Sequence, residues 1–142
     1  MSAEDNKATA RRWYQGVFNE GNLDLIPELF TSNFVDHDPV NPLPGQDGIR
    51  QVVGLYRGAF PDLHITIEDW IAEGDKIVTR FKAQGTHSGP LMGIPPTGKQ
   101  VTVTGIDILG FEHGKISEHW GNRDDLGMLQ QVGAIPAPGQ PA

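Results

Sequence analysis

The last two extended runs of the chain carry acidic side chains among aromatic ones, a combination that can transfer protons. Residues 102–111 and 115–124 are rich in Val, Ile, Thr, Phe and Trp, and His113-Gly114 between them suits a two-residue turn. Side chains alternate across a strand, so a hairpin with this loop predicts one shared face. That face includes Asp107, Trp120, Asn122 and Asp124 among its polar and aromatic members.

A carboxyl group in apolar surroundings gives and takes protons closer to neutral pH than one in water. We therefore predict Asp124 and Asp107 as acid/base groups, with Trp120 and Asn122 as substrate contacts. A second interpretation stays open for each aspartate. Asp124 precedes Asp125-Leu126-Gly127, where a helix can begin, so it can act as a helix cap. Asp107 can lie at a strand edge or pair with a surface cation.

Three more polar residues are candidates for the site, and each has a structural alternative. His37 follows an apolar pair and is predicted as a hydrogen-bond donor in the pocket, or as a surface histidine. His87 ends a strand beside glycines. It is predicted to lie at the pocket mouth, or alternatively to bond a loop carbonyl. Arg80 opposes Asp69 if Gly74-Asp75 is a two-residue loop, which favours an ion pair over a substrate contact.

The composition limits the classes of function. The chain has 142 residues, no cysteine and a formal net charge of −7. This length suits one domain, and the lack of cysteine excludes disulfides and thiolate chemistry. The negative charge disfavours nucleic acid and anionic membranes as partners. The first residues are polar and no apolar run approaches the roughly 20 residues that span a bilayer, so we expect a cytoplasmic protein.

The sequence predicts no cofactor. The five histidines, at positions 37, 64, 87, 113 and 119, lack a compact ligand spacing. No glycine-rich phosphate loop is present either. We therefore expect neither a metal nor a nucleotide.

Apolar spacing predicts helices in the first half of the chain and strands in the second. The predicted helices are 5–19, 23–30, 49–60 and 126–132, and Tyr14 lies on the apolar face of the first, where it is a candidate substrate contact. The predicted extended runs are 33–39, 64–72, 76–87 and the terminal pair, and 40–45 and 89–99 are loops. This order is typical of an α+β domain, here 1–133, in which helices cover a curved sheet and leave a cavity. The Pro/Gly-rich residues 134–142 are predicted to be a disordered tail.

Six short strings, in this order, resemble the SnoaL-like polyketide cyclases, or ester cyclases, of the nuclear transport factor 2-like superfamily. They are Phe34-Val35-Asp36-His37-Asp38-Pro39, Ala59-Phe60-Pro61-Asp62-Leu63, Ala72-Glu73-Gly74-Asp75, Gly85-Thr86-His87-Ser88-Gly89, Gly93-Ile94-Pro95-Pro96-Thr97-Gly98-Lys99, and Glu118-His119-Trp120 with Asp124-Asp125-Leu126-Gly127. The resemblance implies an α+β cone: N-terminal helices packed on a curved antiparallel sheet around a pocket. It also implies that Asp124 is the general acid/base and that His37 lies in the pocket.

The resemblance implies a cofactor-free intramolecular aldol condensation on an apolar small-molecule carbonyl substrate. Three alternatives stay open: epoxide hydrolysis by Asp107 and Asp124 together, a ketosteroid isomerase-like proton transfer, and a non-catalytic binding module. The hairpin register leaves Ile106 and Ile108 on the outer face of the sheet, which predicts a homodimer.

Overall fold

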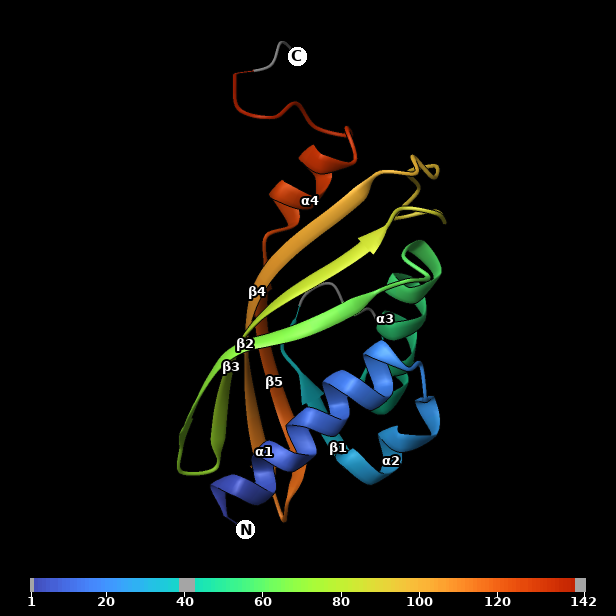
Figure 1. The fold of residues 1–142 in the computed structure, drawn as a ribbon. Helices are drawn as coiled ribbons and strands as arrows, with labels where there is room; N and C mark the ends of the chain where they lie inside the picture. Colours follow the sequence, from blue (N-terminus) through green and yellow to red (C-terminus); the bar gives the residue numbers. More distant parts are fainter. Residues whose placement is uncertain (1, 39–42, 140–142) are drawn as a thin grey trace.

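A five-stranded curved sheet forms the frame of the protein, which we describe from a computed structural model over residues 2–38 and 43–139 (Figure 1). The helical elements are α1 (Ala3–Arg12), the π-helix η1 (Trp13–Asn19), the 3₁₀-helix η2 (Leu23–Leu25), α2 (Ile26–Leu29), α3 (Gly45–Ala59) and α4 (Asp125–Gln131). The strands are β1 (Phe30–Asp36), β2 (His64–Glu73), β3 (Lys76–Thr86), β4 (Gln100–Glu112) and β5 (Lys115–Arg123).

The strands lie in the order β1-β5-β4-β3-β2. The pairs β2–β3, β3–β4 and β4–β5 are antiparallel, while β1 lies parallel to β5 at the edge of the sheet. In Figure 1 the helices α1, α2 and α3 lie on one side of the curved sheet, and α4 lies beside the start of β4. The α+β fold predicted from the sequence is confirmed.

Both predicted two-residue loops are present. Glu73 pairs with Lys76 around Gly74-Asp75, and Glu112 pairs with Lys115 around His113-Gly114. His113 and Gly114 have φ angles of 52° and 77°, the left-handed values that a type I′ hairpin turn requires.

The register beyond the second turn differs from the prediction. Phe111 pairs with Ile116, but Gly110 pairs with Glu118, so Ser117 is an extra residue in β5. Such a β-bulge moves every later side chain of its strand to the opposite face. As a result Asp107 lies opposite Gly121 rather than Trp120, and Leu109 lies opposite His119. The residues predicted to face the pocket from β5 therefore face outward, and their neighbours face inward.

The core lies between the concave face of the sheet and the helices. One buried cluster joins α1 and η1 to the middle of the sheet through residues such as Trp13, Tyr14 and Leu109. A second cluster joins the end of α3 to the start of β4 and to α4 through residues such as Tyr56, Val103 and Met128. The cavity described below lies where these two clusters meet.

Three predicted segments fall partly outside the described residues. The extended run predicted at 33–39 includes residue 39, the loop predicted at 40–45 includes residues 40–42, and the disordered tail predicted at 134–142 includes residues 140–142. Residues 134–136 lie against α4, because the amides of Ala134 and Ile135 donate to the carbonyl of Leu129 and Gln130 donates to the carbonyl of Pro136. Within the described part of the chain, no helix is long and apolar enough to cross a membrane.

Candidate active site

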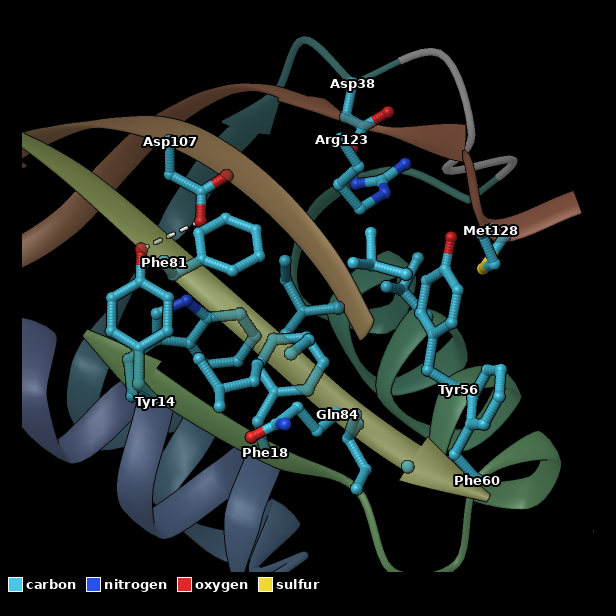
Figure 2. Close-up of a pocket in the computed structure, with 18 of the residues that line it drawn as sticks. Tyr14, Phe18, Asp38, Tyr56, Phe60, Phe81, Gln84, Asp107, Arg123 and Met128 are labelled. Carbon is cyan, nitrogen blue, oxygen red and sulfur yellow. Dashed lines mark hydrogen bonds and ion pairs between the residues drawn. The ribbon is translucent and has the colours of Figure 1, made fainter. Parts of the chain in front are cut away.

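A mainly apolar pocket opens between the helices and the concave face of the sheet (Figure 2). Its apolar lining comes from η1, α3, the central strands and α4, and includes Trp13, Phe18, Ile49, Phe60, Phe81 and Met128. Its charged lining comes from β1 and its end, β4 and β5: Asp36, Asp38, Asp107, His119 and Arg123. The pocket is thus an apolar chamber with one ionic wall, which suits a largely apolar ligand with a few polar groups.

Asp107 is buried in that wall. Its residue is 6 % exposed, and both carboxylate oxygens are hydrogen-bonded. Tyr14 donates its hydroxyl to Oδ2 of Asp107 at 2.8 Å, and Nε2 of His119 lies 2.8 Å from Oδ1. The strand β4 points Asp107 into the chamber because its alternate residues, from Val101 to Phe111, are buried on this face.

His119 bridges two carboxylates. Its Nε2 contacts Asp107, and its Nδ1 lies 2.9 Å from Oδ1 of Asp36 on the neighbouring strand β1. Burial by itself lowers the pKa of His119, but the hydrogen bonds and charges of Asp107 and Asp36 outweigh burial and raise that pKa to about 10. His119 is therefore an imidazolium at neutral pH, with both ring nitrogens protonated and donating.

Tyr14 lies in the first turn of η1, where the chain winds as a π-helix. Both Trp13 and Tyr14 are buried there, and π-helical turns occur often at functional sites. Burial, followed by the negative charge of Asp107, raises the pKa of Tyr14 well above the ordinary tyrosine value. The hydroxyl is consequently neutral and acts as a hydrogen-bond donor to the carboxylate.

Gly121 has no side chain, and the hydrogen bond between Asp107 and His119 occupies the space that a side chain would fill. A Cβ atom added at Gly121 would lie 2.6 Å from Oδ1 of Asp107 and 2.8 Å from Nε2 of His119. Both are far closer than ordinary van der Waals contact, and both atoms belong to the hydrogen bond between these side chains. A glycine is needed here for the direct contact between Asp107 and His119.

Comparisons with known proteins agree with this geometry. The sequence profile of the SnoaL-like polyketide cyclases matches residues 8–132, which is most of the chain. The chain belongs to the SnoaL-like polyketide cyclase family.

Curated relatives and a solved structure match most of the chain. The chain is 29 % identical to the nogalonic acid methyl ester cyclase of Streptomyces nogalater, over 82 % of this chain and 90 % of that protein. It is 25 % identical to the aklanonic acid methyl ester cyclase DnrD of Streptomyces peucetius, over 82 % of this chain and 83 % of that protein. TsrD from Streptomyces laurentii superposes with a TM-score of 0.87 at 28 % identity, over 95 % of this chain and 99 % of that one.

Within this SnoaL-like domain, Asp124 lies outside the pocket. It is exposed and forms the N-cap of α4, where Oδ1 accepts a hydrogen bond from the amide of Gly127 at 2.9 Å. The prediction that Asp124 shares the pocket face with Asp107 is wrong because of the bulge at Ser117. The alternative interpretation of Asp124 as a helix cap describes its observed position.

The same bulge turns Trp120 and Asn122 away from the pocket. Asn122 is exposed, and Trp120 stacks on His37 on the outer face with ring centroids 4.6 Å apart. His37 also lies 2.9 Å from Oε2 of Glu118, so it is a surface histidine. The predictions that Trp120, Asn122 and His37 line the pocket are therefore wrong.

Arg80 and His87 also lie outside the pocket lining. Arg80 pairs with Asp69 at 3.8 Å on the sheet surface, and both side chains are more than half exposed. His87 is fully buried beneath the loop that follows β3, where Nδ1 lies 3.0 Å from Oγ1 of Thr97. For Arg80 the structure favours the alternative role, an ion pair. The side chain of His87 contacts the loop through the hydroxyl of Thr97 rather than through the predicted carbonyl.

Of the predicted residues, the SnoaL-like pocket brings together Asp107 and Tyr14. The charged lining residues that sequence reasoning missed are Asp36, Asp38, His119 and Arg123. Arg123 donates to Oδ2 of Asp38 at 2.6 Å, and it lies at the end of β5 that faces α3. No group of three side chains that could hold a metal ion occurs among residues 2–38 and 43–139.

Proposed function

We propose that this protein is a cofactor-free polyketide cyclase in which Asp107 transfers the proton and Tyr14 and His119 stabilise the developing charge. The observation that carries the proposal is the position of Asp107, a carboxylate at the wall of an apolar pocket between two hydrogen-bond donors. The names of two curated relatives specify methyl ester cyclases, which supports a carbonyl substrate of this kind.

The first step forms an enolate. Asp107 removes a proton from the carbon next to a substrate carbonyl, so negative charge moves from the carboxylate to the carbonyl oxygen. The neutral carboxyl group accepts hydrogen bonds more weakly than the carboxylate did. Tyr14 and His119 can then donate to the enolate oxygen, and donors aimed at developing charge in a dry site lower the barrier.

The second step closes the ring. The enolate carbon attacks a second carbonyl of the same substrate, a carbon–carbon bond forms, and the resulting alkoxide takes the proton back from Asp107. The protein returns to its starting state, and the product is an isomer of the substrate. His119 keeps its proton in this scheme because Asp36 stays ionised 2.9 Å from its Nδ1 while Asp107 is neutral.

The test compares one substitution at two aspartates. Asp107→Asn is nearly isosteric but cannot accept the proton, so kcat for ring closure should fall by on the order of a hundredfold to ten-thousandfold. Asp124→Asn keeps an N-cap residue and should change kcat by less than about twofold. Nogalonic and aklanonic acid methyl esters, the compounds in the relatives' names, are the first substrates to try, with product detected by chromatography and mass spectrometry.

The other outcomes of this assay separate the rival functions. Ring closure that persists in Asp107→Asn contradicts the proposal. Hydrolysis of an epoxide without ring closure would favour a hydrolase. The position of Asp124 at the head of α4 argues against a hydrolase mechanism that uses Asp107 and Asp124 together. Binding of the esters without turnover would favour a binding module.

We also propose that the protein forms a homodimer through the outer face of the sheet. The location of the protein in the cytoplasm stays a prediction. Ile106 is 51 % exposed there, next to the half-buried Ile108 and Trp120. Large exposed aliphatic side chains on a sheet face favour packing against a second copy. Light scattering should give twice the monomer mass for the wild type and the monomer mass for Ile106→Lys/Ile108→Lys. A monomeric wild type at micromolar concentration contradicts this proposal.

A further inference from the structure

The pocket has a second polar position that the proposed mechanism does not use. Figure 2 shows Tyr14 and Asp107 together on one side of the pocket, and Tyr56, Arg123 and Met128 on the other. Tyr56 lines the pocket from α3, where Ile49, Val53 and Tyr56 recur at helical spacing on the buried face. Its residue is 9 % exposed.

The hydroxyl of Tyr56 is buried without a hydrogen-bond partner among residues 2–38 and 43–139. A buried polar atom without a partner is costly, and phenylalanine would fill the same volume without that cost. Tyr14, at the other side, contrasts with it because its hydroxyl is satisfied by Asp107 at 2.8 Å. No acceptor among residues 2–38 and 43–139 takes the proton of the Tyr56 hydroxyl, so a molecule that enters the pocket can accept it.

The surroundings of Tyr56 favour a neutral acceptor over an anion. The Arg123 guanidinium lies 5.6 Å from the centre of the Tyr56 ring, but Asp38 contacts it at 2.6 Å and Asp125 lies 3.6 Å away. An incoming carboxylate would meet these acidic groups. Burial raises the pKa of Tyr56 despite the opposing influence of the nearby Arg123 cation, so the hydroxyl stays protonated. Because Arg123 has donors and no acceptor, the partner that the hydroxyl still lacks is an acceptor oxygen.

We infer that Tyr56 is a specificity-determining residue that donates a hydrogen bond to a neutral carbonyl oxygen of the substrate, remote from the carbonyl that reacts at Asp107. The inference rests on the proposed function for the identity of the reacting end. A substrate held at both ends is fixed in one orientation along the apolar chamber, which places the correct carbon against Asp107. The site therefore selects polyketides that carry carbonyl groups at both ends.

A binding experiment tests this without catalysis. The probes are 2-acetylanthraquinone and 2-ethylanthraquinone, which have the same skeleton and differ by one terminal carbonyl oxygen. Trp13 lines the pocket, so quenching of tryptophan fluorescence reports binding. The affinity ratio of the acetyl to the ethyl compound should fall by about three- to tenfold in Tyr56→Phe, the usual effect of one neutral hydrogen bond.

The matched control is Tyr14→Phe, which removes a hydroxyl from the opposite side of the same pocket. It should change the affinity of both probes alike and leave their ratio at the wild-type value. An unchanged ratio in Tyr56→Phe, or an equal fall in the ratio in both variants, overturns the inference. If neither probe binds the wild type, both the inference and the assignment of the pocket to apolar carbonyl compounds are wrong. If Tyr56→Phe lowers the ratio while Asp107→Asn retains full ring closure, the proposed mechanism fails and the role of Tyr56 stands.

Discussion

A histidine–carboxylate contact lies on each face of β5, with nearly equal distances and different consequences. On the inner face, His119 lies 2.8 Å from Asp107 and 2.9 Å from Asp36, and its side chain is 14 % exposed. On the outer face, His37 lies 2.9 Å from Glu118, and both side chains are about 40 % exposed. Solvent screens the outer pair, whereas the inner one is enclosed and has two carboxylate partners. Enclosure and two carboxylate partners, rather than the contact distance, keep the inner histidine a cation at neutral pH.

The largest difference between the faces is expected in catalysis. His119→Gln keeps a side chain of similar reach but removes the positive charge, so ring closure should slow by on the order of a hundredfold to a thousandfold. His37→Gln makes the same change on the outer face and should alter kcat by less than about twofold. Single-turnover rates of both variants, with circular dichroism to verify folding, would measure the contrast. Equal losses in the two variants would contradict the distinction between the faces.

A smaller effect is expected from a methyl group at Gly121. Gly121→Ala forces apart the Asp107 and His119 atoms that lie 2.6 and 2.8 Å from the added carbon, so kcat should fall by roughly tenfold to a hundredfold in a folded protein. Gly110→Ala is the matched control in β4, because the nearest atom to its Cβ is an ordinary 3.4 Å away. Similar kinetics for the two variants would show that the direct Asp107–His119 contact is not needed.

The third prediction concerns stability and pH. The pKa of His119 is about 10 in the folded protein and near 6.5 in an unfolded chain. A raised folded-state pKa means that the contribution of His119 is fully present below about pH 6.5 and is lost as the pH rises through 10. Urea unfolding of the wild type and of His119→Gln should therefore give free energies that differ at pH 7 and converge at pH 10.5. His37→Gln should stay close to the wild type at both values, and a gap for His119→Gln that widens with pH would contradict the assigned charge.

The sequence predicted the elements well because their signals are local. Helical spacing, two turn dipeptides and proline positions mark the helices and hairpins, and six short strings indicate the family. Asp107 was found for the same reason, since it lies on the regular strand β4. The bulge at Ser117 has no comparable signal, because an extra residue in a strand leaves the composition unchanged.

Charge could have distinguished the two registers. The regular register places Asp107, Asn122 and Asp124 on the buried face with no cation, which leaves carboxylates without partners. The bulged register places His119 and Arg123 on that face instead, so each buried aspartate gains a cationic partner. Asp36 could be found only in three dimensions, since its contact with His119 depends on the parallel pairing of β1 with β5. The rule that buried charges are paired therefore carries more information about register than the turn does.

The edge position of β1 also has a consequence for folding. Its one neighbour in the sheet is β5, and 83 residues separate Asp36 from His119 along the chain. β1 can therefore pair in the sheet only after β5 has been synthesised and has docked. A contact of such high sequence separation slows folding. Until then Asp36 and Asp107 lack the imidazolium that joins them. A ribosome-bound chain that ends before β5 thus has neither β1 paired within the sheet nor the link between Asp36 and Asp107, and both arise in the same late event.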